Sequence, residues 1–248
     1  MARTHEALKR AEEEYQENFL RGLGEPVEKE VSPPPRRAAN RDDMEWYDDL
    51  KTNLLSRYPN GSIKKILFNG TFHGGGCTTT AVNFSIALAR DPKLRVLLVD
   101  VNLRTPKLHE VFRIDHTHGL SDLSTNSDTM TYLIKKISQE NLSVLTCGGN
   151  YSVPVGLFES AQFDHLLKTA SEDFDYVILD APPVPRFSEC RVLCAKVDGV
   201  ILVLQAGQTR KQVALKAKRT LEEAGAKVLG VVLNRRKYYI PELIYRQL

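Results

Sequence analysis

Six consecutive residues between an apolar segment and a helix-forming segment have the composition of a phosphate-binding loop. They are Gly74, Gly75, Gly76, Cys77, Thr78 and Thr79. In such a loop the glycines let backbone N–H groups converge on phosphate oxygens, and the amino end of the following helix adds a favourable partial charge. A lysine reaches the β- and γ-phosphates, and a Ser or Thr hydroxyl binds Mg²⁺. Thr78 supplies the hydroxyl here, but Cys77 occupies the lysine position, so the predicted phosphate site lacks its cation.

Two aspartates at the ends of apolar segments also indicate nucleotide chemistry. Asp100 follows Val96–Val99, and Asp180 follows Val177–Leu179. Ligands of an open α/β sheet bind at the carboxyl ends of its strands, so both carboxylates are expected beside the loop. One carboxylate can hold Mg²⁺ or its waters, and the other can accept a proton from an attacking hydroxyl. We therefore predict Asp100 and Asp180 as catalytic residues and, together with Thr78, as the ligands of Mg²⁺.

The segments that would position these residues alternate between strands and helices. Six strands are predicted at 64–69, 95–100, 142–147, 175–180, 199–205 and 227–234. Several are near-continuous runs of Val, Ile and Leu, which is typical of strands buried on both faces of a parallel sheet. The alternation predicts a three-layer α/β/α domain with a doubly wound, mostly parallel sheet.

The chain divides into a charged tail and a domain. Residues 1–42 include a cluster of glutamates at 12–17 and three prolines at 33–35, a composition that cannot bury enough apolar surface to fold. Apolar residues at helical spacing within 8–19 predict either a short amphipathic helix that docks on a partner or a solvated tail with transient helix. Residues 43–248 form the predicted domain, which opens with an amphipathic helix that ends before Pro59.

Composition argues against nucleic-acid-binding, membrane-spanning and secreted proteins. The net charge of +3 over 248 residues is too small to indicate nucleic acid as the main partner. No apolar run approaches the roughly 20 residues of a membrane-spanning helix, and the amino end lacks the apolar core of a secretory signal. We therefore expect a soluble, cytoplasmic protein. The four cysteines, Cys77, Cys147, Cys190 and Cys194, lack metal-binding spacing and are expected to be free thiols.

In their order along the chain, these motifs resemble the bacterial tyrosine kinases (BY-kinases), P-loop proteins that control capsule and exopolysaccharide assembly. The resemblance extends from residue 43 to about 246, and it is to the form made as a separate cytoplasmic chain. Gly74–Thr79 corresponds to the Walker A loop, Val96–Arg104 to the family's second Walker A-type motif, and Val177–Pro183 to Walker B. The resemblance implies a P-loop NTPase fold of the MinD-like group, ATP or ADP with Mg²⁺ as cofactors, and Asn234 as a contact to adenine.

The departures from the family pattern mostly concern charge. Cys77 replaces the Walker A lysine, and Asn102 replaces the second aspartate of the family's Asp-x-Asp motif. In the helix before the loop the family has Glu-x-x-Arg-x-x-Arg, which contacts neighbouring protomers of a ring. This chain has Glu45, Asp48 and Lys51 at these positions, so the resemblance assigns an oligomer contact to them with one cation replaced by an anion.

The family's tyrosine cluster, which is its site of autophosphorylation, is reduced near the carboxyl end of this chain. The candidate phosphoacceptors are Tyr238, Tyr239 and Tyr245. Apolar residues at 240, 243 and 244 stand between them, and this pattern favours tyrosines that anchor a packed segment over tyrosines of a phosphoacceptor tail.

These departures predict a pseudokinase that regulates polysaccharide polymerisation and export, with ATP binding and phosphotransfer weak or lost. The resemblance implies the cytoplasmic segment of a membrane polysaccharide co-polymerase as a partner, with an active kinase paralogue as a second one. The sequence is compatible with a homo-oligomer. It is also compatible with recruitment to the inner face of the membrane through a partner. Nucleic acid is not expected as a partner.

Two other functions fit the same fold. An active ATP-dependent protein-tyrosine autokinase would need a cation from elsewhere, such as Lys107, Arg104 or a neighbouring protomer. A partition-type P-loop ATPase or scaffold would lack the same lysine. Cys77 also has two interpretations: a thiol whose pKa falls at the amino end of a helix and which is redox-reactive, or a small residue tolerated in a loop released from nucleotide binding.

Overall fold

The computed structural model describes residues 41–59, 61–123, 132–137, 141–149, 155–184 and 189–235. The predicted tail up to residue 40 and the segment 236–248, with Tyr238, Tyr239 and Tyr245, lie outside the described residues. The boundary between tail and domain therefore stays a prediction.

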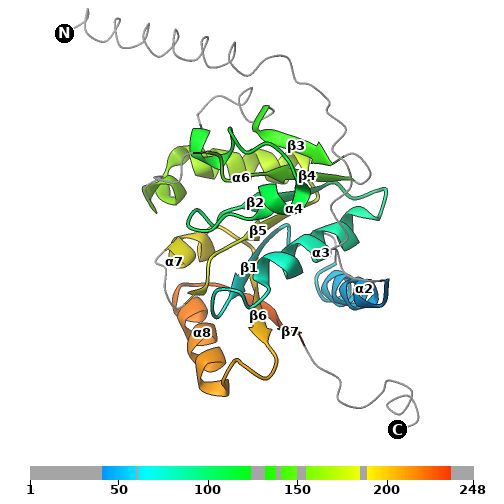
Figure 1. Cartoon of the computed structure of the whole chain (residues 1–248), viewed down its shortest axis with the longest axis vertical. Coiled ribbons are helices and arrows are strands. Elements are labelled where there is room, and N and C mark those ends of the chain that lie inside the picture. Colours follow the sequence, from blue (N-terminus) through cyan, green and yellow to red (C-terminus); the bar gives the residue numbers. More distant parts are fainter. Residues whose placement is uncertain are drawn as a thin grey trace, which may run out of the picture.

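Seven strands form one twisted sheet in the order β3-β4-β2-β5-β1-β6-β7 (Figure 1). Their bounds are β1 (Lys65–Gly70), β2 (Val96–Asp100), β3 (Ile134–Ile137), β4 (Leu142–Leu145), β5 (Tyr176–Asp180), β6 (Gly199–Gln205) and β7 (Val228–Asn234). All neighbouring strands pair in parallel except β3, which runs antiparallel to β4 at one edge. This arrangement confirms the predicted mostly parallel, doubly wound sheet.

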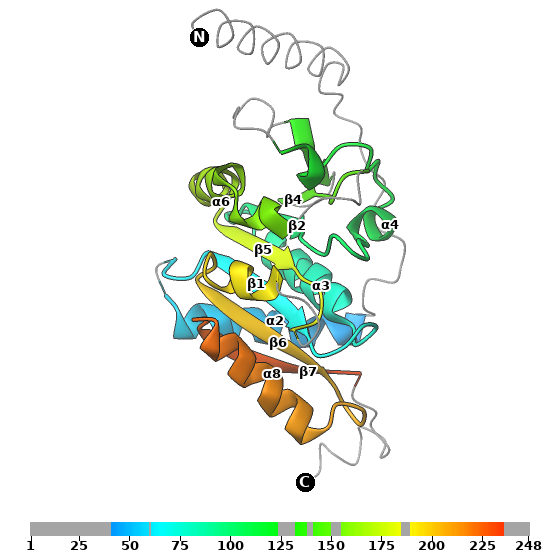
Figure 2. The same ribbon diagram turned by 90° about the vertical axis from the view of Figure 1, so that its left-hand side faces the viewer.

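Helices cover both faces of the sheet, as Figure 2 shows for α6 and α8 on one side and α3 and α4 on the other. The helices are α2 (Arg41–Arg57), α3 (Cys77–Ala89), α4 (Leu108–Phe112), α6 (Ala161–Asp173), α7 (Glu189–Cys194) and α8 (Lys211–Glu223), with short 3-10 turns η1 (Leu120–Asp122) and η2 (Val155–Glu159). Side chains from α2, α3 and α4 form one hydrophobic core against the sheet, and those from α6, α7 and α8 form the other.

Strand β3 is the element that the sequence did not predict. Its sequence, Ile-Lys-Lys-Ile, has no run of apolar residues, and only Ile137 is buried. An edge strand buries one face at most, so short amphipathic segments of this kind resemble loops in a sequence. Strand β4 is two residues shorter than predicted because the carbonyls of Thr146 and Cys147 accept hydrogen bonds from Leu120 and Ser121 of η1.

Helix α2 confirms the predicted amphipathic helix before Pro59. Met44 and Leu54 are buried against α3, and Lys51 donates from Nζ to the backbone carbonyl of Ala87 at 3.3 Å. Within the described ranges, no helix is long and apolar enough to cross a membrane.

Candidate nucleotide site

The glycine loop connects the carboxyl end of β1 to the amino end of α3. Gly74 and Gly76 have φ angles of +83° and +89°, a left-handed conformation that side chains other than glycine disfavour. Gly76 is the N-cap of α3, and its carbonyl accepts the first helical hydrogen bond from Thr80 at 2.9 Å. No side chain caps this helix end, so the N–H groups of its first turn keep the anion-binding geometry of a helix amino end.

Asp180 lies fully buried at the carboxyl end of β5, beside this loop. Neither of its carboxylate oxygens has a hydrogen-bond partner of normal distance and angle among the described residues, although the Thr78 and Cys77 side chains lie close enough to favour its charged form. Burial, and next the charge of Asp100, raise the pKa of Asp180 well above its ordinary value, and the Thr78 and Cys77 side chains offset only part of this shift. Asp180 therefore holds a proton more tightly than an exposed aspartate does, and a cation beside it would favour its charged form.

Asp100 stands directly beside Asp180 in the register of β2 and β5, but its surroundings differ. Its Oδ2 accepts hydrogen bonds from the backbone N–H groups of Lys107 (2.9 Å) and Leu108 (3.1 Å), and its Oδ1 accepts one from Asn102 (3.2 Å). Burial raises the pKa of Asp100, and these three donors lower it. The carboxylate caps the amino end of α4, so much of its hydrogen-bonding capacity is already used.

The Asn102 side chain also forms hydrogen bonds within its own loop, after β2. Its side-chain Nδ2 donates to Thr105 Oγ1 at 3.1 Å, and its Oδ1 accepts from the Thr105 backbone N–H at 3.3 Å. The amide is buried and carries no charge, so it shapes the turn after β2 and adds no negative charge for a metal ion.

The Cys77 thiol is directed toward the end of β5. Its Sγ lies 4.0 Å from the carbonyl oxygen of Ala181, at the outer limit of a sulfur hydrogen bond. Burial raises the pKa of the Cys77 thiol well above its usual value, and the neighbouring Asp180 raises it further. The interpretation of Cys77 as a thiolate with a lowered pKa is therefore wrong, because burial and the carboxyl group outweigh the helix end. Within the described ranges all four cysteines are free, and the other three are buried as expected.

Comparisons with known proteins place this geometry in a family. A model of the AAA domain family AAA_31 matches residues 63–224. Tyrosine-protein kinase YwqD of Bacillus subtilis is 31% identical over 193 residues, covering 78% of this chain and 81% of YwqD. The crystal structure of the chimerical protein CapA2B2 is 30% identical with a TM-score of 0.70, covering 78% of this chain and 85% of that one. The chain belongs to the bacterial tyrosine kinase (BY-kinase) family.

The BY-kinase fold extends to more distant P-loop proteins. The cell division ATPase MinD of Pyrococcus furiosus superposes with a TM-score of 0.59 at 22% identity, over 74% of this chain and 78% of MinD. That likeness concerns the fold alone, and it confirms the predicted P-loop NTPase-like architecture. Membership of the BY-kinase family itself suggests nucleotide and Mg²⁺ as ligands.

The two cations that the sequence suggested as substitutes for the BY-kinase lysine are engaged elsewhere. Arg104 binds Glu189 through Nη2 at 2.8 Å and through Nε at 3.2 Å. Lys107 pairs with Glu110 at 3.2 Å on the surface of α4. In this conformation neither side chain supplies the charge that Cys77 lacks.

Asn234, the predicted adenine contact, lies against the glycine loop itself. Its Nδ2 faces the carbonyls of Gly75 and Gly76 at 3.3 and 3.4 Å, respectively. A Cβ atom on Gly76 would come within 2.0 Å of that nitrogen. Asn234 therefore holds the loop in place from the end of β7, a role that sequence reasoning missed because the partners are 158 residues apart.

Asn69 is a residue of the site that sequence reasoning did not assign to it. Its Nδ2 donates to the carbonyl of Pro182 at 2.9 Å and approaches the sulfur of Cys190 at 3.3 Å. The only sequence signal was its position, as an amide at the carboxyl end of β1 immediately before the loop. This contact ties the β1 end to the chain that follows Asp180.

Buried acceptor atoms gather at this edge of the sheet. Asn69 Oδ1, Glu189 Oε2 and both oxygens of Asp180 lack a hydrogen-bond partner among the described residues. The Asp180 carboxyl group and the Thr78 hydroxyl are oxygen donors of the kind that would hold a magnesium ion, and the backbone of Gly74–Thr79 fits a phosphate group. The charges do not fit phosphoryl transfer, since no described cation reaches the loop where the lysine of a P-loop would stand. We therefore derive no phosphoryl-transfer step from this site.

The assigned oligomer contacts are partly used within the chain. Asp48 pairs with Arg90 of α3 at 3.5 Å, and Lys51 contacts the Ala87 carbonyl, whereas Glu45 is exposed. The contact of Glu45, Asp48 and Lys51 with a second protomer stays a prediction.

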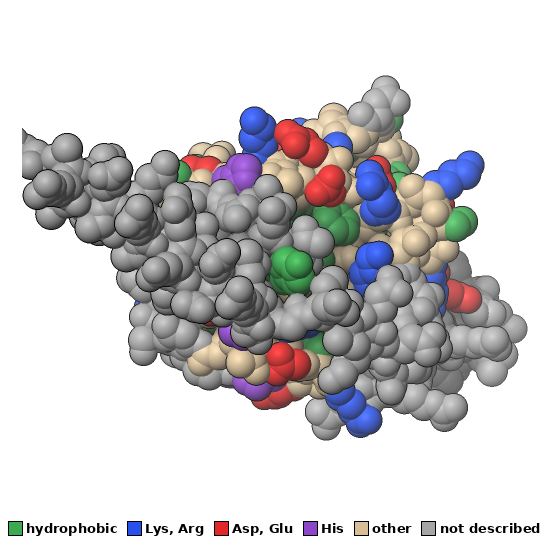
Figure 3. Space-filling model, turned by 90° about the horizontal axis from the view of Figure 1, so that it is seen from above, with side chains coloured by type: hydrophobic (Ala, Val, Ile, Leu, Met, Phe, Trp, Pro, Cys, Tyr) green, Lys and Arg blue, Asp and Glu red, His purple; other side chains and the backbone are tan. Residues whose placement is uncertain are grey.

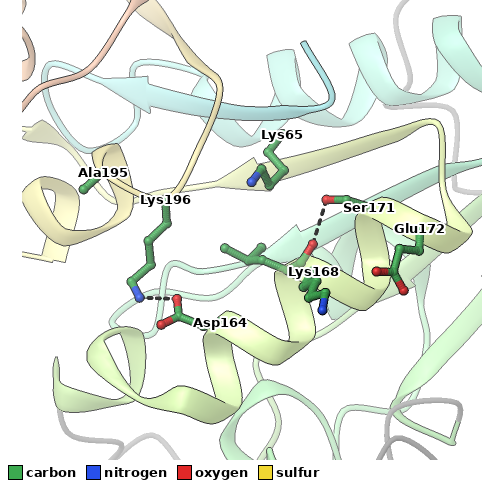
Figure 4. Close-up of a pocket in the computed structure, with 8 residues that line it drawn as sticks. Lys65, Asp164, Lys168, Ser171, Glu172, Ala195 and Lys196 are labelled. Atoms are coloured by element: carbon green, nitrogen blue, oxygen red, sulfur yellow. Dashed lines mark hydrogen bonds and ion pairs between the residues drawn. The ribbon is translucent and has the colours of Figure 1, made fainter. Parts of the chain in front are cut away.

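A pocket of about 460 Å³ lies at the opposite ends of the strands, between α6 and the start of β1 (Figure 4). Lys65 and Lys196 line it, but Asp164 binds Lys196 and Asp198 lies 3.7 Å from Lys65. The opposite charges largely balance, and the pocket is remote from the glycine loop, so we do not assign it to nucleotide binding.

Proposed function

We propose that this BY-kinase relative is a pseudokinase that regulates capsule or exopolysaccharide polymerisation and export by binding partners. The observation that carries the proposal is the Cys77 side chain at the lysine position, where its Sγ lies 4.0 Å from the Ala181 carbonyl oxygen and beside the buried Asp180 carboxyl group. The fold and the loop backbone are retained, and among the described residues no lysine stands at the position of the Walker A cation.

The magnitudes support a greater loss of catalysis than of binding. A charged hydrogen bond to phosphate contributes about 1.5–3 kcal/mol, so its loss weakens nucleotide binding roughly 10- to 100-fold. A cation that stabilises the transferring phosphoryl group is worth about 10³–10⁵ in rate, by analogy with arginine fingers. Asn102 removes a second charge from the same site. Weak nucleotide binding with negligible phosphotransfer follows from these figures.

The binding role would use surfaces outside the nucleotide site. Its partners would be the cytoplasmic segment of a membrane polysaccharide co-polymerase and an active kinase paralogue. Support comes from the family and from Trp46 on α2, whose large side chain is 58% exposed. Exposed tryptophans are enriched at the centres of protein interfaces.

A titration with Mg-ATP and Mg-ADP tests the proposal. We expect the unaltered chain to bind weakly and to form no phosphotyrosine, and we expect Cys77→Lys to bind roughly 10- to 100-fold more tightly. Cys77→Ala is the matched control, because it removes the thiol without adding charge, and it should gain no such affinity. Calorimetry measures binding, and phosphotyrosine detection after incubation with Mg-ATP measures phosphotransfer.

The result also separates the rival function. Micromolar binding together with phosphotyrosine in the unaltered chain would establish an active autokinase and overturn the pseudokinase. Absence of binding by both the unaltered chain and Cys77→Lys would show that the loop no longer accepts a nucleotide, which supports a purely partner-binding role.

A further inference from the structure

Positive charge concentrates on one unit at the edge of the sheet, formed by α8 and β7. The exposed cations there are Arg210, Lys211, Lys216, Lys218, Arg219 and Arg235, and the acidic residues in the same stretch are Glu222 and Glu223. Lys227, immediately before β7, lies instead over the Tyr58 ring, 4.5 Å from its centroid. On the face seen in Figure 3, by contrast, basic and acidic side chains are interspersed. The small net charge of the whole chain therefore conceals a strongly basic surface.

The same unit exposes large apolar side chains. They are Val213, Leu215, Val231 and Leu233, which are 39, 46, 53 and 55% exposed, respectively. Elsewhere in the described ranges, the large apolar side chains with comparable exposure are Trp46 and Tyr132. Val213 points away from Leu215, because residues two apart on a helix do not share a face. We refer to Leu215, Val231, Leu233 and the surrounding cations as the α8–β7 face.

The packing explains why these apolar side chains are uncovered. In the register with β6, Val231 lies beside Leu202 and Leu233 beside Leu204, so both point to the side of the sheet that α8 covers. Helix α8, however, buries only Ala217 and Leu221. Because β7 is the last strand of the sheet (Figure 2), no described strand pairs beyond it, and Val231 and Leu233 stay exposed.

Cations and apolar groups are interleaved along α8. Leu215 lies one helical turn from Lys211 on one side and from Arg219 on the other, so the three side chains form one exposed stripe. Lys218 pairs with Glu222 at 3.0 Å, whereas Lys211, Lys216 and Arg219 have no carboxylate partner in the described part of the chain. Their charge is available to an external anion.

We propose that the α8–β7 face binds directly to an anionic lipid bilayer. Cations next to a negatively charged leaflet and aliphatic side chains at the boundary of its acyl chains both gain free energy there. A nucleic acid would use the cations but not the exposed aliphatic side chains. This contact is independent of the proposed function, since a pseudokinase and an active kinase would bind the membrane alike.

Sedimentation of the full chain with vesicles tests the proposal. We expect binding to vesicles of phosphatidylcholine containing phosphatidylglycerol, weaker binding at high salt, and none to phosphatidylcholine alone. Each cation contributes about fivefold to the partition coefficient, so the double variant Lys211→Glu/Arg219→Glu should lower it at least about 25-fold. Leu215→Ser should lower it severalfold while leaving the salt dependence unchanged.

Matched controls keep the experiment specific. Arg57→Glu and Lys93→Glu change equally exposed cations outside this face, and Trp46→Ser removes an exposed apolar side chain from α2; all three should bind as the unaltered chain does. Unchanged circular dichroism of each variant checks the fold.

Three results would overturn the proposal. The first is equal binding to charged and uncharged vesicles. The second is full binding by the double variant together with loss of binding on removal of residues 236–248, which would assign the contact to that segment. The third is binding to duplex DNA or to an acidic protein at concentrations that leave the vesicles free.

Discussion

Asp100 and Asp180 lie side by side at the ends of β2 and β5, but their environments separate their roles. Three backbone N–H groups hold the Asp100 carboxylate, whereas no described backbone N–H donates to the Asp180 carboxylate, which has the Thr78 and Cys77 side chains nearby. A functional P-loop would balance such a carboxyl pair with a metal ion and a lysine. With Cys77 in place of the lysine, the charged form of the buried Asp180 carboxylate destabilises the folded state, whereas the protonated form does so much less.

This cost predicts how the stability of the Asp180→Asn variant depends on pH. Because the pKa of Asp180 is raised in the folded state, the folded chain holds a proton that the unfolded chain releases near pH 4. The free energy of unfolding therefore falls as the pH rises from about 4 through the raised pKa. We expect Asp180→Asn to raise the free energy of unfolding by on the order of 1–3 kcal/mol at pH 8 and to change it little at pH 4.

Urea denaturation at both pH values measures this difference. Asp100→Asn is the control, since its amide NH2 group would replace one accepting oxygen and face either the Asn102 N–H or the Lys107 and Leu108 N–H groups, and it should destabilise the fold at both pH values. A less stable Asp180→Asn variant at pH 8 would show that the carboxylate is charged and satisfied in the folded chain.

At the scale of elements, the sequence was sufficient to predict those helices and strands whose burial requires a recognisable pattern of apolar residues. The five buried strands β1, β2, β4, β5 and β6 are near-continuous apolar runs, and α2 has an apolar stripe, so their positions were predictable. Contacts between distant segments were not predictable. The Asn234–Gly76 contact joins the end of β7 to the glycine loop, and neither residue type nor local spacing records such a pairing. Strand β3 was missed for a similar reason, because its stability comes from pairing with β4.

The contact between β7 and the loop predicts a coupling between Gly76 and Asn234. Gly76→Ala combines a left-handed φ with a Cβ that displaces the Asn234 amide, so we expect it to cost about 2–4 kcal/mol of stability. Gly74→Ala, which has a similar φ and open space around the new Cβ, should cost about 1–2 kcal/mol.

A double-mutant cycle isolates that coupling. Once Gly76→Ala has already displaced the amide, adding Asn234→Ala should cost less than Asn234→Ala costs alone. Additive effects of the two substitutions, measured by thermal unfolding, would mean that Asn234 does not hold the loop.

At the scale of the whole molecule, the chain combines a retained P-loop scaffold with a basic edge at α8 and β7 and a second exposed feature, Trp46, on α2. The nucleotide site lies at the carboxyl ends of the strands, while α2 packs against α3 on one face of the sheet and α8 covers the other. Partner binding, lipid binding and nucleotide binding would thus use separate surfaces. Because the surfaces are separate, nucleotide binding could be lost while the fold, partner binding and lipid binding are kept.

Truncation from the amino end tests where the folded domain begins, because the thermal stability should fall only when residues that pack in the core are removed. Both hydrophobic cores use described residues from Met44 onward, so removal of residues 1–40 should leave the thermal unfolding midpoint unchanged. Removal of residues 1–57 deletes α2, and with it the burial of Met44 and Leu54 against α3 and the Asp48–Arg90 pair. Because burial of two such side chains alone is worth about 3–6 kcal/mol, we expect the shorter chain to unfold or aggregate. A large loss of stability from removing residues 1–40 alone would instead show that the tail packs on the domain, and would move the domain boundary toward the amino end.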